Sequence, residues 1–171
     1  MNLSVRYIGL ICIFGLALTA AGAPPPEVRP ELRPPGGQVV LLKARGKGKQ
    51  IYKCTANAWT LEKPDATLFD EAGRRIGKHY EGPTWEASDG SKVVGQLLQR
   101  DDAPQAGAVP WLLLKAKTNE GSGRFAKVTY IQRVNTAGGA APKTGCDESH
   151  AGKELSVNYQ ADYYFYVPQS R

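Results

Sequence analysis

The two histidines are the side chains in this sequence best suited to metal or acid–base chemistry. His79 and His150 are the only histidines in the chain. Carboxylates lie near both of them in sequence, at Glu81, Glu86, Asp89, Asp147, Glu148 and Glu154. Two imidazoles and one carboxylate would hold a metal ion or run acid–base chemistry if the fold brought them together. The histidines are 71 positions apart and form no local ligand motif. We favour two unrelated polar histidines, and the alternative is an enzyme centred on His79, Glu86 and His150.

Nucleophilic catalysis has weaker support in the sequence. Ser88, Ser91 or Ser149 would complete a Ser-His-Asp arrangement with either histidine, but the chain has no Gly-x-Ser-x-Gly nucleophile elbow. A reactive cysteine is disfavoured because we expect Cys54 and Cys146 to be bonded to each other. We therefore predict no catalytic residue, no metal and no cofactor.

Aromatic residues give the best indication of ligand binding. Trp85 follows a Gly82–Pro83 corner, where its ring would be displayed for stacking on a sugar or another apolar-faced molecule. Burial in the core is the competing interpretation, because aromatic side chains dominate the cores of small domains. We predict a ligand site made of Trp85, His79, Glu86, Tyr80 and His150.

The charge pattern does not predict a nucleic-acid partner. The net charge is +6, which permits only weak attraction to anions. Four cations surround one predicted glycine-rich hairpin, at Lys43, Arg45, Lys47 and Lys49. They would bind a phosphate or an anionic surface, but a solvated turn that protects a sheet edge is the simpler interpretation. No aromatic residues are interleaved with them to stack on bases.

The first 23 residues are typical of a secretory signal peptide. Arg6 precedes an uncharged apolar run over residues 7–18, and small residues fill positions 19–23. The run is shorter than the roughly 20 residues that span a bilayer, so we predict cleavage after Ala20, Ala21 or Ala23. The mature protein would be secreted or periplasmic, with no transmembrane segment.

Two further segments complete the predicted organisation. Six of the twelve prolines lie within residues 24–35, so residues 24–37 are predicted to be a Pro-rich extended linker or a strap over the domain surface. Residues 38–168 are predicted to be one domain, and the 171-residue chain is too short for two full-sized domains. Removal of the signal leaves two cysteines, Cys54 and Cys146, which predict one disulfide in an exported chain.

Short apolar runs separated by turn residues predict an all-β domain. Residues 38–42 and 50–54 would flank a hairpin at 45–49, and residues 66–69 and 74–80 would flank another at 70–73. A strand over 111–116 would turn at 119–123 into a strand over 124–134, and residues 155–167 alternate with period two. No sustained 3.6-residue apolar period is present. These patterns predict a single antiparallel β-sandwich or β-barrel with one disulfide.

Eight stretches of the mature chain are long and unusual enough to indicate a family. They are Ile-Tyr-Lys-Cys at 51–54, His-Tyr-Glu-Gly-Pro-Thr-Trp at 79–85, Asp-Gly-Ser-Lys-Val at 89–93, Pro-Trp-Leu-Leu-Leu-Lys-Ala at 110–116, Tyr-Ile-Gln-Arg-Val-Asn-Thr at 130–136, Gly-Gly at 138–139, Gly-Cys-Asp at 145–147 and Ala-Asp-Tyr-Tyr-Phe-Tyr at 161–166. With them, residues 38–167 resemble the exported family of domains of unknown function numbered 3455. The resemblance implies a secreted or periplasmic protein and brings no catalytic residues.

Some relatives in that family carry a malate-dehydrogenase label, which the residues here do not support. A dinucleotide fold needs a glycine triplet between a strand and a helix, whereas residues 45–51 lack the third glycine and lead into another predicted strand. We expect a monomeric, non-enzymatic binding or envelope-associated module whose partner is a small molecule, a glycan or an envelope component. The alternatives are a small extracytoplasmic hydrolase or metal-dependent enzyme, and a purely structural or stress-protective surface protein.

Overall fold

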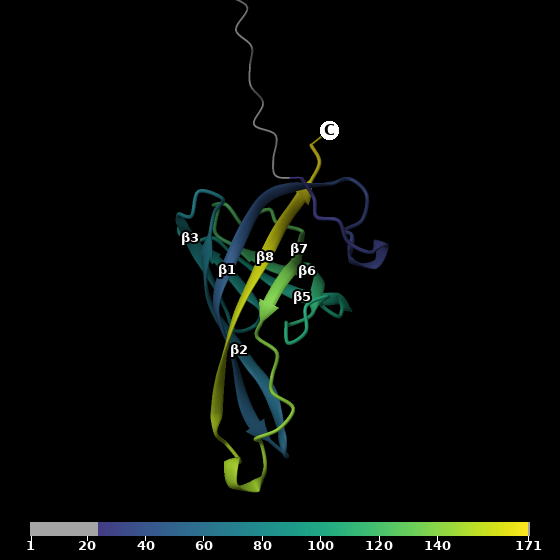
Figure 1. The fold of residues 1–171 in the computed structure, drawn as a ribbon. Helices are drawn as coiled ribbons and strands as arrows, with labels where there is room; N and C mark the ends of the chain where they lie inside the picture. Colours follow the sequence, from purple (N-terminus) through teal and green to yellow (C-terminus); the bar gives the residue numbers. More distant parts are fainter. Residues whose placement is uncertain (1–23, 171) are drawn as a thin grey trace, which may run out of the picture.

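The computed structural model describes residues 24–170, which fold into a closed antiparallel barrel (Figure 1). Each strand pairs with the next one along the chain, and the last strand pairs with the first to close the barrel. The strands are β1 (Gln38–Thr55), β2 (Ala58–Phe69), β3 (Arg75–Tyr80), β4 (Thr84–Ala87), β5 (Lys92–Asp101), β6 (Trp111–Glu120), β7 (Tyr130–Gly138) and β8 (Glu154–Pro168). The predicted all-β fold with a disulfide is confirmed, and it is a barrel rather than a sandwich. The predicted signal peptide lies outside the described residues.

Strand β8 has the alternation predicted from its sequence. Its inward side chains, Tyr159, Ala161, Tyr163 and Phe165, all belong to the barrel core. Tyr164 and Tyr166 point to the opposite face and join a separate apolar cluster outside the barrel. Both faces of this strand are therefore buried along its second half, which is unusual for an antiparallel sheet that normally leaves one face in water.

The predicted hairpin at residues 45–49 is wrong, because β1 runs through this segment as one continuous strand. Gly46 and Gly48 are needed for close approach rather than for a turn. A Cβ atom at Gly48 would lie 2.1 Å from the Asp65 carbonyl oxygen, and one at Gly46 would lie 2.6 Å from the Tyr163 ring. The basic residues of this segment lie on the outer face of β1, where Lys43 and Arg45 pair with Asp162 of β8 at 3.6 and 3.3 Å.

The loop between β6 and β7 folds into one end of the barrel. The sequence predicted a strand from residue 124, but β7 begins at Tyr130, because the preceding loop buries Phe125 and Val128 in the core. Asn119 Nδ2 donates hydrogen bonds to the carbonyl oxygens of both residues. The Phe125 ring stacks on Phe165 at 4.5 Å between centroids, so this end of the barrel is closed by aromatic packing.

Residues before β1 pack over the outer face of the barrel. Val28 and Leu32 join the apolar cluster formed with Leu113, Tyr164 and Tyr166. Leu32 lies in a short 3-10 helix, η1 (Pro30–Leu32), and its carbonyl oxygen accepts a hydrogen bond from Gln132 Nε2. This segment covers the outward side chains of β6, β7 and β8, which explains why β8 is buried on both faces.

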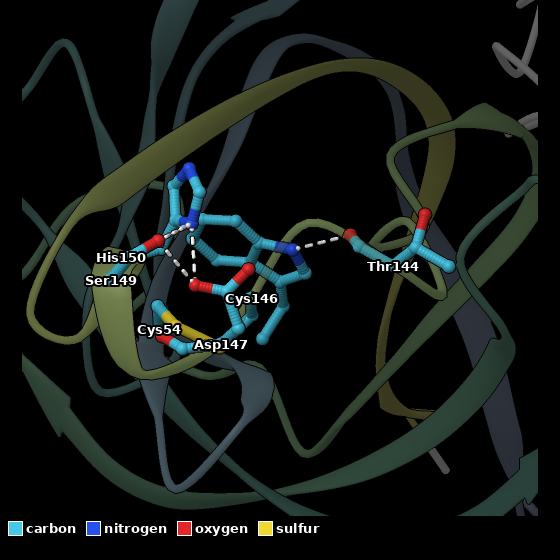
Figure 2. Close-up of a disulfide and its surroundings, with 7 residues drawn as sticks. Cys54, Thr144, Cys146, Asp147, Ser149 and His150 are labelled. Carbon is cyan, nitrogen blue, oxygen red and sulfur yellow. Dashed lines mark hydrogen bonds and ion pairs between the residues drawn. A yellow bond between two sulfur atoms is a disulfide. The ribbon is translucent and has the colours of Figure 1, made fainter.

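At the end of the barrel opposite the β6–β7 loop, the β1–β2 hairpin extends beyond the barrel beside the segment that leads into β8 (Figure 1). Cys54 in β1 is bonded to Cys146 in that segment, and Trp59 Nε1 donates a 3.0 Å hydrogen bond to the Thr144 carbonyl oxygen (Figure 2). The segment also contains the 3-10 helix η2 (Glu148–His150). Among residues 24–170, no helix is long and apolar enough to cross a bilayer.

Candidate functional site

The barrel contains a cavity of about 660 Å³ at the end from which the β1–β2 hairpin extends. Strands β1 to β7 and the segments 108–110 and 140–141 contribute to its wall. The apolar part of the wall comes from Leu61, Pro64, Leu97, Val109, Leu112 and Leu114. The buried polar part comes from Gln50, His79 and Arg133. An apolar wall with a few placed polar groups is the usual composition of a small-molecule site.

Strand register explains why the cavity lies at this end. Ile131 and Arg133 share the inward face of β7, and they lie opposite Phe165 and Tyr163 of β8. At the Ile131 level the interior is filled by Phe165, Leu114 and Phe125. Two residues further along β7, the guanidinium of Arg133 and tyrosine hydroxyls take the place of the apolar side chains, and they pack less completely.

Arg133 is the main charged group inside the barrel wall. It is 9% exposed, and its Nε donates a 3.0 Å hydrogen bond to the Pro110 carbonyl oxygen. Within residues 24–170, no carboxylate lies within ion-pair distance of it. A buried charge without an opposite charge is costly, so Arg133 stands out as a functional candidate.

His79 faces the interior from β3 and is 3% exposed. Its Nδ1 lies 2.8 Å from the Thr84 carbonyl oxygen. A carbonyl can only accept, so Nδ1 carries the proton and Nε2 is the free acceptor of the neutral ring. Burial, opposed in part by the Thr84 hydrogen bond and assisted by the charge of Arg133, lowers the pKa of His79 to about 3. The imidazole is therefore neutral at ordinary pH.

Two buried N–H donors in the cavity wall have no hydrogen-bond partner. They are Gln50 Nε2 and Trp85 Nε1, and both side chains are 1% exposed. The Trp85 ring stacks on His79 at 4.3 Å between centroids, with 9° between the planes. Trp85 thus lies in β4 with its ring in the core, not displayed on a loop. Buried donors are normally paired, so these two are exceptions in the cavity wall.

Tyrosine hydroxyls complete the polar interior around Arg133. Tyr52 donates to the Gly139 carbonyl oxygen, and the hydroxyls of Tyr159 and Tyr163 lie 3.2 Å apart. Burial raises the pKa of all three, and the positive charge of Arg133 partly opposes that rise. They stay protonated and cannot neutralise the guanidinium.

Tyr80 and Glu86, both predicted to be ligand-binding, are paired on the outer face of β3 and β4. Tyr80 Oη donates a 2.8 Å hydrogen bond to Glu86 Oε2, and Lys78 Nζ lies 3.4 Å from Glu86 Oε1. Burial and the neighbouring carboxylate raise the pKa of Tyr80 to about 12, whereas the hydrogen bond from Tyr80 lowers the pKa of Glu86. The strand pairing places Glu86 beside Lys78, on the face opposite His79 and Trp85.

His150 lies in η2, and it is not part of the cavity wall. Its Nδ1 is 2.8 Å from Asp147 Oδ1 and 3.0 Å from Ser149 Oγ (Figure 2). A catalytic triad needs the acid on one ring nitrogen and the nucleophile on the other, but here a single nitrogen faces both. Hydrogen bonds from Ser149, and then from His150, lower the pKa of Asp147 to about 2. The contacts stabilise a local turn.

The two-histidine centre, which was the alternative interpretation of the sequence, is not assembled in this fold. His79 points into the barrel, Glu86 points outward, and His150 belongs to η2. Within the described part of the chain, no three His, Cys, Asp or Glu side chains are grouped so as to hold a metal ion. Of the predicted ligand-binding residues, the structure brings together His79 and Trp85 in the cavity wall.

Sequence reasoning missed Arg133, Gln50 and Tyr52. The alternation of side chains between the two faces of a strand was the one signal that could have found Arg133. It lies two positions from Ile131, so on a strand it must share the core-facing side with an apolar residue. Gln50 could have been found in the same way, because it lies two positions before Tyr52 and four before Cys54 in the predicted strand 50–54 and shares their buried face.

Residues 34–167 match the family model described as "Protein of unknown function (DUF3455)". The match spans most of the chain, so the protein belongs to this family, as its motifs predicted. No curated protein and no solved structure matches the chain.

Proposed function

We propose that the protein is a non-enzymatic binding module that holds one small molecule in the open end of its barrel. The observation that carries this proposal is the cavity wall, in which Gln50 Nε2 and Trp85 Nε1 are buried without partners. Each unpaired buried donor costs about 1–3 kcal/mol. A ligand that accepts hydrogen bonds would recover that cost, whereas a purely structural barrel would gain by replacing the same side chains with apolar ones.

The opening of the cavity supports the same proposal. Leu61 and Leu97 are about half exposed and line the opening, where they would contact an apolar ligand as it binds. The eight-strand size is also suitable, since barrels of this size either fill with side chains or hold one small ligand.

Cavity blocking provides the direct test of the binding proposal. A thermal-shift screen of small organic molecules on the mature chain should find compounds that raise the melting temperature of the wild type. Leu112→Trp, which fills the cavity, should abolish the shifts. Leu98→Trp, at an exposed position of β5 that does not line the cavity, should leave them unchanged. Shifts that persist in Leu112→Trp, or a screen without any shift, would reject the proposal.

We also propose that the module acts after export. The signal-like residues 1–23 and the Cys54–Cys146 bond support this location, because disulfides persist in oxidising compartments. In its host, the tagged full-length chain should be recovered outside the cytoplasm at the mature mass. A chain without residues 1–23 should remain inside, and equal export of the two would reject the proposal.

A further inference from the structure

We infer that the cavity selects small molecules that combine one carboxylate with an apolar body, and that Arg133 binds the carboxylate. This inference rests on the proposed binding function and specifies its ligand class. The cavity wall contains one buried cation and two unpaired N–H donors. All three recognise an acceptor, and the cation requires that the acceptor be negatively charged.

A single carboxylate fits the charge of the buried wall. Arg133 is the charged side chain that is buried there, whereas Glu62, Arg100 and Asp102 lie exposed at the rim, where water screens them. His79 is neutral and the tyrosines stay protonated. One positive charge is balanced by one negative charge, and a guanidinium matches the planar fork of a carboxylate. A doubly charged phosphate would leave an excess negative charge in the barrel.

The remainder of the wall requires an apolar body on the ligand. Leu112 and Leu114 of β6 and Val109 lie on one side, and Pro64 of β2 lies on another. The cavity volume of about 660 Å³ is much larger than an acetate ion needs. An apolar body would gain about 25 cal/mol for each Å² that it removes from water, while the carboxylate sets the orientation.

Three probes of matched structure test the inference: cinnamate, cinnamyl alcohol and acetate. Titration of the mature protein by calorimetry, with quenching of tryptophan fluorescence as a second readout, should give at least tenfold tighter binding of cinnamate than of either other probe. Trp59 and Trp85 line the cavity, so quenching should accompany binding. Arg133→Gln should remove the preference for the acid and keep the affinity for the alcohol. Arg75→Gln, at an exposed position of β3 that does not line the cavity, should behave as wild type.

The outcomes separate this inference from the proposal beneath it. If the alcohol binds the wild type as tightly as the acid, the carboxylate assignment is wrong while the binding cavity stands. If acetate binds as tightly as cinnamate, the apolar body is wrong. If no probe binds and Leu112→Trp changes nothing in the wider screen, both proposals fail. The comparison of the three probes on the wild type needs no variant, so it tests the carboxylate preference even if Arg133→Gln does not fold.

Arg133→Lys, which keeps the charge without the planar fork, should retain a reduced preference for the acid.

Discussion

The two ends of the barrel interior differ in what holds them together. At one end, Phe125 from the β6–β7 loop packs on Phe165, and the neighbouring side chains are apolar and buried. At the other end, Arg133, His79 and Gln50 face a cavity, and the segment beside its opening is tied to β1 by a disulfide. The first end is stabilised by packing. The second has polar groups and a cavity in place of apolar packing. The disulfide holds the segment beside its opening in position.

Removal of the disulfide should give the largest loss of stability, and it should act on the cavity end. Cys54 and Cys146 are 92 positions apart, and the chain-entropy model gives up to about 4–5 kcal/mol for a loop of that size. Cys54→Ser with Cys146→Ser should lower the free energy of unfolding, measured by urea titration, by an amount approaching that limit. A reductant should destabilise the wild type and have no effect on the double variant. Equal stability of the wild type and the double variant would show that packing alone holds the segment beside the cavity opening.

Truncation of Phe125 should break the closed end. The ring is fully buried, so Phe125→Ala should lower the free energy of unfolding by about 3–5 kcal/mol. The exposed Leu98→Ala provides the control and should change it by less than about 0.5 kcal/mol. A loss below about 1 kcal/mol in Phe125→Ala would mean that the loop is not part of the core.

Acidification should destabilise the polar end through His79. Its pKa is about 3 in the folded protein against an ordinary value of 6.5, so below pH 6.5 the unfolded chain binds a proton that the folded barrel excludes. Stability should therefore fall as the pH falls, by about 1.4 kcal/mol per unit, or about 2 kcal/mol between pH 7.5 and pH 5.

Urea titrations at several pH values would measure that slope. His79→Gln should flatten it in this window. The window lies above the ordinary values of Asp70, Glu86, Asp89 and Asp147, whose pKa values are lowered in the folded protein, so those carboxylates do not contribute to it. An unchanged slope in His79→Gln would contradict the prediction.

The smallest effect should be a gain in stability at the cavity. Gln50→Met replaces a buried amide whose Nε2 is unpaired with an apolar side chain of similar size, so it should raise the free energy of unfolding by about 1 kcal/mol. Gln160→Met on the exposed face of β8 should have no effect. A destabilised Gln50→Met would mean that the amide already contributes to the fold, and that the two ends differ less than we infer.

Particular residues show how far sequence reasoning reached. The period-two pattern placed Tyr159, Tyr163 and Phe165 on one face correctly, because alternation is a local property of a strand. Gly46 and Gly48 were misassigned to a turn, because a glycine needed for a tight turn and one needed for close strand packing look the same in sequence. The Cys54–Cys146 pair was predicted because only two cysteines remained, which left no alternative pairing.

The candidate site was harder to predict because its members come from distant strands. His79 and Trp85 are six positions apart and pair directly across β3 and β4, so their association follows from one short hairpin. Gln50 and Arg133 lie 83 positions apart and share a cavity only because the barrel closes. His150 is an equally plausible ligand in sequence, but it lies in η2 outside the cavity.

By itself, the sequence determined the secondary-structure class, the faces of its last strand, its family and its cysteine pair, since each depends on local alternation, on motifs or on simple counting. The tertiary structure decided that the sheet closes into a barrel, that one end is filled by Phe125, and that Arg133 lies in the other end without an opposite charge. Closure and register bring together side chains that are remote in the chain, and no local pattern records which interior positions will meet.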